Sequence, residues 1–202
     1  MDHKNKVFKN LINFIQSKEM FALLIGKEDG HAHSIALAAL LVCFFGQEKN
    51  ILFRTSSVKD IETYLSKALS GFWNGDPGDN KFRKRIKESV KKRNFSIASM
   101  NIFIDTTNPR SRVITPEKLH GAIVYPVENF LSQNCIFEKC LSDLQSRKSE
   151  KIIFCTAASE VDFDGLNILK PVMLNDEKLL YKKSFDFIKY MPQDSMAYSM
   201  AS

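Results

Sequence analysis

The residues with the clearest chemical pattern lie in a short polar loop between an apolar strand and an apolar helix. Residues 21–25 form a continuous apolar run, Gly26 follows it, and Ser34 precedes a second apolar run. The layout is similar to a phosphate-binding loop of the form G-x-x-x-x-G-K-[ST], whose second glycine lets the backbone approach a phosphate and whose lysine contacts the outer phosphates. Ala32 stands at that glycine and His33 at that lysine. The sequence therefore predicts the architecture of this loop more clearly than an activity.

The loop keeps some of the groups that attract an anion. Backbone amides at the start of the helix favour a phosphate even without a lysine. Lys27 lies in the same loop and supplies a cation from another direction, whereas a neutral imidazole with a pKa near 6.5 supplies no permanent charge. We therefore expect at most a weak nucleotide site here, made by Lys27, Gly30, His33 and Ser34 together with Asp105 from a later strand, and no other cofactor.

A strongly basic helix is predicted over residues 81–93, after a loop rich in glycine and aspartate. Phe82, Ile86 and Val90 recur every four residues and give this helix one apolar edge. Glu88 is its single acidic residue. The cationic side chains, which we take as nucleic-acid-binding candidates, are Lys81, Arg83, Lys84, Arg85, Lys87, Lys91, Lys92 and Arg93.

Two interpretations of the basic helix remain open. Its cations bind phosphate backbones with a salt-dependent affinity, while Phe72 and Trp73 in the preceding loop stack on unpaired bases. Alternatively, the helix is a solvated surface whose lysines only keep the protein soluble.

Other patterns of reactive residues are weaker. His31 and His33 have no third ligand at a familiar metal-site spacing, so we read them as polar loop residues. Asp105 with Glu117 and Lys118 is similar to the acidic set of metal-dependent nucleases, but the residue expected between Glu117 and Lys118 is missing. The sequence contains no nucleophile elbow. We therefore predict no catalytic residue and no metal site.

Composition and charge limit the class of protein. The chain has 202 residues, of which 44% are hydrophobic and 26% charged, as in a soluble globular domain. Its net charge of +6 favours a polyanionic partner. The longest apolar run is much shorter than the roughly 20 residues that a membrane span needs, and no secretory signal is visible. We expect a cytoplasmic protein that does not contact membranes, with its cysteines reduced.

Strands alternate with helices along the chain. Apolar strands are predicted at residues 21–25, 50–55, 95–105, 121–125 and 151–156. The helices predicted between them include one that Ser34 opens and one over about residues 128–147. This alternation predicts a single α/β domain over residues 1–202, a three-layer sandwich with a mostly parallel central sheet. Within it we expect an N-terminal helix in residues 1–19, the loop plus basic helix in residues 70–94, and a frayed tail in residues 191–202.

The order of these elements resembles the RecA-like branch of the P-loop NTPases over roughly residues 20–190. The resemblance implies an acidic residue near the end of strand 101–105, a magnesium-binding aspartate at the end of strand 121–125, and a polar sensor on strand 151–156. Ser34 matches the magnesium-binding hydroxyl of the family, but Tyr125 occupies the aspartate position. The motifs are therefore degenerate, and a bound metal would need Asp105 or Glu128 instead.

Three hypotheses follow. The first is a non-catalytic RecA-like subunit that binds nucleic acid or a partner protein in DNA or RNA transactions. The second is an active nucleotide- or nucleic-acid-hydrolysing enzyme that uses Lys27, Ser34 and Asp105 in altered roles. The third is an assembly or regulatory subunit without nucleic-acid binding. The resemblance also favours a protein partner or a homo-oligomer.

Overall fold

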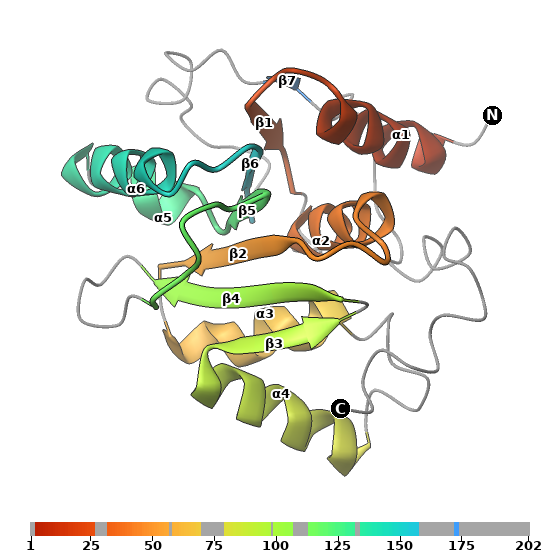
Figure 1. Ribbon diagram of the computed structural model, residues 1–202, viewed down its shortest axis with the longest axis vertical. Helices are drawn as coiled ribbons and strands as arrows, with labels where there is room; N and C mark the ends of the chain where they lie inside the picture. Colours follow the sequence, from red (N-terminus) through yellow and green to blue (C-terminus); the bar gives the residue numbers. More distant parts are fainter. Residues whose placement is uncertain are drawn as a thin grey trace.

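The computed structural model contains one sheet of seven strands in the order β3-β4-β2-β5-β6-β1-β7 (Figure 1). The structure describes residues 3–26, 32–56, 58–69, 79–97, 99–106, 113–131, 134–157 and 172–173. The strands are β1 (Phe21–Leu24), β2 (Asn50–Thr55), β3 (Asn94–Ile97), β4 (Met100–Thr106), β5 (Gly121–Val124), β6 (Ile152–Cys155) and β7 (Val172–Met173). Every neighbouring pair is parallel except β3 and β4. The predicted mostly parallel sheet is confirmed.

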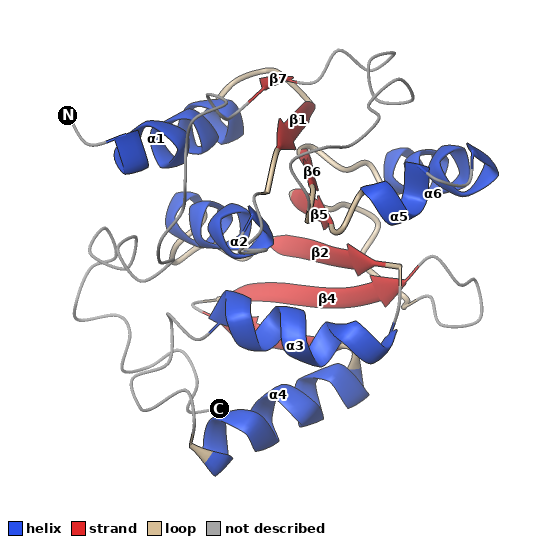
Figure 2. Ribbon diagram, turned by 180° about the vertical axis from the view of Figure 1, so that it is seen from behind, coloured by secondary structure: helices blue, strands red, loops and turns tan. Residues whose placement is uncertain are grey.

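Six described helices cover the two faces of the sheet. They are α1 (His3–Gln16), α2 (Ala32–Cys43), α3 (Val58–Leu69), α4 (Asn80–Lys92), α5 (Glu128–Leu131) and α6 (Asn134–Ser146). Core residues of α1 to α4 share one apolar cluster, and those of α5 and α6 belong to a second cluster on the other face. Figure 2 shows α3 lying over β4 on the first of these faces. The structure is therefore a three-layer α/β sandwich, as the sequence predicts.

Helix α2 is buried on all sides. Its residues from Ala32 to Leu41 are all buried, because α1 and α3 flank it and the sheet lies beneath it. This explains why the segment reads as a continuous apolar run without amphipathic periodicity. The helix begins at Ala32, before the predicted start at Ser34. His33 and Ser34 therefore lie inside its first turn, which corrects the prediction that Ser34 opens the helix.

Two predicted elements are divided in the structure. The strand predicted over residues 95–105 is the antiparallel hairpin of β3 and β4, which breaks near Ser99, where φ is 69°. The single helix predicted from residue 128 to 147 consists of α5 and α6. The tail predicted at residues 191–202 lies outside the described residues.

Candidate functional site

In α/β sheets, ligands bind at the carboxyl ends of the parallel strands. At this edge of the sheet, the residues that follow β1 and β6 are in close contact. Gly26 follows β1, and its N–H donates to Thr156 Oγ1 at 2.7 Å. A Cβ atom on Gly26 would lie 2.1 Å from the Thr156 carbonyl oxygen. Only a glycine therefore allows the loop after β1 to leave the sheet at this point.

His33 lies beneath the surface in the first turn of α2. Its side chain has no exposed area. Its Nε2 lies 3.0 Å from the Tyr64 carbonyl oxygen, and because a carbonyl only accepts, Nε2 carries the proton in this contact. The imidazole is thus engaged in the fold, in a position where the family resemblance implies a cation directed at a phosphate.

Aromatic rings enclose this imidazole. The Tyr125 ring stacks on it with centroids 4.1 Å apart, and Tyr64 and Phe53 meet its edges at 5.6 and 6.0 Å. Burial, with smaller contributions from Tyr64, Cys155 and Glu128, raises the pKa of Tyr125. A tyrosine that stays neutral offers no charge to a metal ion. Two of the three positions at which the sequence departs from the family pattern, His33 and Tyr125, are therefore in direct contact with each other.

Glu128, an alternative metal ligand in the sequence analysis, lies close to this ring cluster at the start of α5. Its Oε1 accepts a hydrogen bond from Ala157 N at 2.7 Å. The carboxylate thus connects α5 to the segment after β6. Ser34, which the resemblance matches to the magnesium-binding hydroxyl of the family, is 1% exposed.

Asp105 lies on the opposite face of the sheet, in an ion-pair network that the sequence analysis missed. Its Oδ2 is 2.7 Å from Arg54 NH2, and the same nitrogen is 2.5 Å from Asp143 Oδ2. Asp105 and Arg54 are 0% and 1% exposed. The guanidinium thus joins β4, β2 and α6, and Arg147, the residue after α6, adds a second cation 3.7 Å from Asp105.

The positive and negative charges of this network compensate one another. Burial opposes ionisation of Arg54, but the surrounding Cys140, Asp105 and Asp143 outweigh that effect and raise its pKa. Burial would raise the pKa of Asp143, but Arg54 and Arg147 outweigh burial and lower it. Two arginines and two aspartates therefore balance one another.

The structure does not bring Asp105 together with His33 and Ser34. Successive strand residues face opposite sides of a sheet. Phe53 faces the imidazole, so Arg54 and its register partner Asp105 face α6. Three of the expected nucleotide-binding residues are thus described, and they divide between two faces.

Helix α4 presents the predicted basic surface and is firmly anchored. Asp79, from the loop rich in glycine and aspartate, is its N-cap and accepts a hydrogen bond from Lys81 N at 3.1 Å. Phe82 and Ile86 are each 2% exposed and pack into the core. Arg93 ends the helix with a φ of 60°. The helix therefore holds its cations in fixed places.

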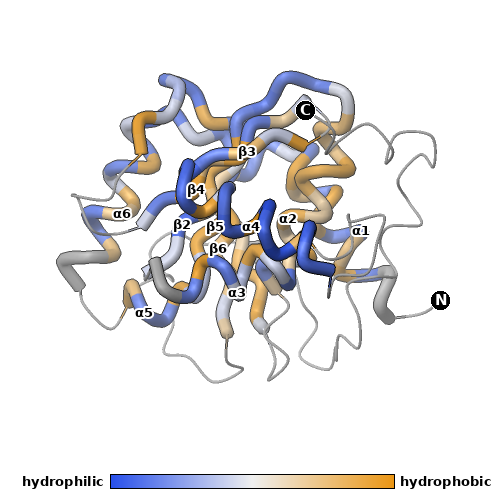
Figure 3. The backbone as a smooth tube through the Cα atoms, turned by 90° about the horizontal axis from the view of Figure 1, so that it is seen from below, coloured by the Kyte–Doolittle hydropathy of each residue, from blue (hydrophilic) through white to orange (hydrophobic). Residues whose placement is uncertain are grey.

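The cations of α4 point in more than one direction. Figure 3 shows α4 as a largely hydrophilic stretch on this side of the molecule. A helix turns about 100° per residue, so three cations lie opposite the buried edge and Arg83 lies beside them. We call these four the solvent face of α4: Arg83, Lys84, Lys87 and Lys91. All four are exposed, and none forms an ion pair within the described residues. Lys81 and Lys92 are also exposed, whereas Arg85 and Arg93 are half-buried.

The remaining candidates are placed as follows. Glu117 pairs with Lys148 and Lys118 with Glu150, both on the surface. They therefore do not converge with Asp105. Lys27, Gly30, His31, Phe72 and Trp73 lie outside the described residues. Among the residues that the structure describes, no group of three metal-ligating side chains is found, and no helix is long and apolar enough to cross a bilayer.

Comparison with solved structures finds a similar fold in a viral protein. A scan against family models finds no matching family, and a search of curated proteins finds no relative. The fold is similar to that of the large terminase from a thermophilic bacteriophage, solved in complex with ADP. The TM-score is 0.49 and the identity 11%, over 88% of this chain and 47% of the terminase chain. This chain thus spans about half of that protein, and the likeness concerns the fold alone.

Proposed function

We propose that this chain is a non-hydrolysing domain of RecA-like type that binds nucleic acid through the solvent face of α4. The observation that carries the proposal is the row of four exposed cations without ion pairs in the described part of the chain. Such cations bind phosphates and release counterions, which gives affinity without sequence preference.

The spacing of the four cations fits a nucleic-acid backbone. From Arg83 to Lys91 the helix rises about 12 Å at about 1.5 Å per residue. A DNA strand places one phosphate about every 3.4 Å along the duplex axis. Because the strand also winds around this axis, neighbouring phosphates are farther apart than this rise, and the solvent face is long enough to contact more than one of them.

The absence of hydrolysis is proposed from the surroundings of His33 and Tyr125. The imidazole is fully buried and stacked on a neutral phenol. Neither group supplies the permanent charges that phosphates and magnesium require. In this proposal, the packed side chains of His33 and Tyr125 occupy the motif positions at which an active family member has charged residues.

The first test is binding to labelled single- and double-stranded DNA and RNA across a salt series. A variant with Arg83→Glu, Lys84→Glu and Lys87→Glu should lose at least about 30-fold in affinity, and the salt slope on duplex should fall by roughly 2 to 3. The matched control carries Lys9→Glu, Lys18→Glu and Lys139→Glu, which change net charge equally at exposed sites elsewhere.

The outcomes separate the three hypotheses. Equal losses in both variants would mean that only net charge matters, which contradicts a defined interface. No binding by the wild type at about 50 mM salt would favour the assembly subunit. Turnover of ATP or nucleic acid by the wild type would favour the enzyme.

A further inference from the structure

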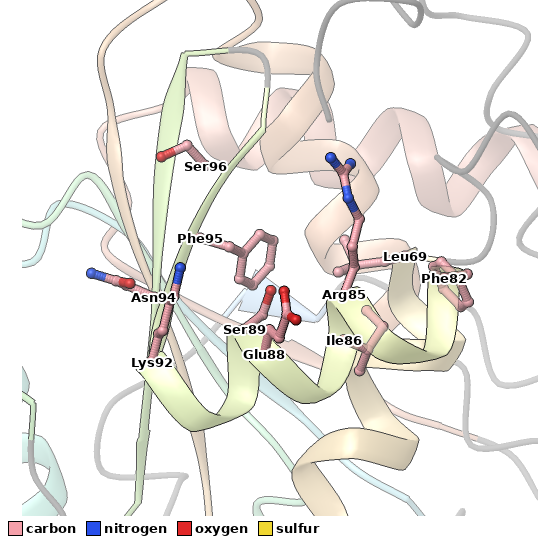
Figure 4. A pocket seen from close by; sticks show the side chains of 10 residues that line it. All are labelled: Leu69, Phe82, Arg85, Ile86, Glu88, Ser89, Lys92, Asn94, Phe95 and Ser96. Carbon is pink, nitrogen blue, oxygen red and sulfur yellow. The ribbon is translucent and has the colours of Figure 1, made fainter. Parts of the chain in front are cut away.

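A groove lies between α4 and the edge strand β3. Its volume is about 440 Å³, and residues of α3, α4 and β3 line it. Phe95 is half-buried and supplies apolar surface to this groove, while Leu69, Phe82 and Ile86 lie almost fully buried at its floor. Figure 4 shows the Phe95 ring directed from β3 toward α4. In Figure 1, β4, β3 and α4 follow one another, so the groove lies beyond β3, the edge strand at this end of the sheet.

The backbone of β3 offers hydrogen-bonding groups at this edge. Ile104 N donates to Arg93 O at 2.8 Å, which marks a hydrogen-bonded position of the β3–β4 ladder. Such positions alternate along an antiparallel ladder. Asn94 and Ser96 therefore direct their backbone N–H and C=O groups away from β4, and no described residue pairs with these groups.

The charge around the groove is positive. Arg85 and Lys92 line it on the α4 side, with Glu88 as the one acidic lining residue. Over its whole length α4 carries seven Lys or Arg residues against this single glutamate, and β3 carries no charge. An acidic ligand is therefore attracted to the groove.

We propose that the β3–α4 groove binds an extended acidic peptide segment of a partner protein, which adds to β3 as a further strand. Strand addition to an exposed sheet edge uses main-chain hydrogen bonds for affinity and side-chain pockets for specificity. Here the outward groups of Asn94 and Ser96 supply the main-chain bonds, and the half-buried Phe95 ring contacts alternate apolar side chains of the peptide.

A peptide fits this edge better than a nucleic acid does. An edge strand presents donors and acceptors in alternation, and a peptide backbone satisfies both. A phosphate backbone offers acceptors alone, so the carbonyl groups of Asn94 and Ser96 would stay unpaired. The groove also uses Arg85 and Lys92, which lie on a different side of α4 from the solvent face defined above. This inference therefore does not rest on the proposed nucleic-acid binding.

The test uses the full chain and a labelled octapeptide of alternating Asp and Val with blocked termini. We expect binding of the Asp-Val peptide, and none of a Lys-Val counterpart. Two forms of the Asp-Val peptide carry N-methyl groups on alternate residues, one on the odd positions and the other on the even positions. They have equal charge, but only one of them has its N-methyl groups on the peptide edge that faces β3. That isomer should lose at least about tenfold in affinity, and the other should bind like the parent peptide.

Protein variants locate the site. Ser96→Pro removes an outward N–H without breaking a ladder bond, and should lower the affinity at least about tenfold. Ser96→Ala is its matched control, because it loses the Ser96 Oγ bond to Asn101 and keeps the N–H. Arg85→Glu with Lys92→Glu should weaken binding similarly, whereas Arg83→Glu with Lys87→Glu should leave it within about threefold.

Three results would overturn the proposal. The first is no binding of the Asp-Val peptide up to about 1 mM. The second is equal binding of both N-methylated isomers, which would show attraction by charge alone. The third is loss of peptide binding on reversal of Arg83 and Lys87, with displacement by duplex DNA, which would assign the peptide to the nucleic-acid surface.

Discussion

The interior network around Arg54 and the solvent face of α4 treat charge in opposite ways. Arg54 is 1% exposed and shares one nitrogen between two carboxylates. Lys84 and Lys87, by contrast, are exposed and have no ion-pair partner in the described part of the chain. Charges inside the sheet are thus balanced within the protein, whereas those on the solvent face of α4 are exposed to solvent.

This difference indicates which acidic and basic residues the fold requires and which it does not. A buried charge must be paired, because an isolated charge in a low dielectric is costly. An exposed cation on an anchored helix needs no partner to be stable. Asp105 therefore acts as a structural counter-ion to Arg54, although its place at a strand end suggested a site residue.

The largest expected effect is loss of the interior charge balance. Asp105→Ala leaves the buried Arg54 guanidinium with one carboxylate fewer, and also removes the acceptor for Thr106 N at 2.7 Å. We expect a loss of about 3–5 kcal/mol in the free energy of unfolding, measured by urea denaturation. The control Glu117→Ala breaks an exposed pair and should cost less than about 1 kcal/mol. Comparable effects of the two variants would contradict the structural role of Asp105.

The second prediction restores the family residue in the buried first turn of α2. His33→Lys places an ammonium among Tyr125, Tyr64 and Phe53 at a fully buried position, where it loses its hydration. We expect destabilisation by about 2 kcal/mol or more, and no rise in melting temperature with ATP and magnesium. His33→Gln, whose amide can still donate to the Tyr64 carbonyl, should cost less. Stabilisation of the lysine variant by nucleotide would show that the site is open.

The third prediction concerns single cations of α4. Lys84→Ala should lower affinity for duplex DNA by about two- to fivefold and the salt slope by about 1, uniformly across sequences. Its free energy of unfolding should change by less than about 0.5 kcal/mol. A stability loss without a change in salt slope would place Lys84 with the interior charges.

The sequence predicts the layers of the fold well, because strands buried on both faces read as continuous apolar runs. This is true of β1, β5 and β6, each of which is almost wholly buried. It also predicts α4, whose apolar edge and cap are local features. Hydrophobic periodicity and capping depend on residues within one element, so they can be recognised from the sequence.

The site was harder to predict because its contacts join distant segments. His33 stacks on Tyr125, and Asp105 meets Arg54 and Asp143, across different elements. One signal was present: opposite charges stand near the ends of two otherwise apolar strands, β2 and β4. A buried arginine in such a strand requires a carboxylate nearby, and that argument would have identified the pair.

The smallest expected effect separates the two regions by pH. In the folded protein the pKa of Asp143 is lowered below the ordinary value of 3.8, mainly because Arg54 and Arg147 outweigh burial. The unfolded chain therefore binds a proton first as pH falls. The stability from Asp143 is complete above about pH 4 and is lost as pH falls toward its folded pKa.

Urea denaturation between pH 7 and pH 3 should thus show an acid loss that Asp143→Asn reduces, while DNA affinity through α4 stays constant from about pH 8 to pH 5. A loss of DNA affinity over that range would mean that a titrating side chain lies at the α4 interface. If Asp143→Asn loses as much stability at acidic pH as the wild type does, other carboxylates govern the acid stability. Either result would remove the separation between balanced interior charges and unbalanced surface cations.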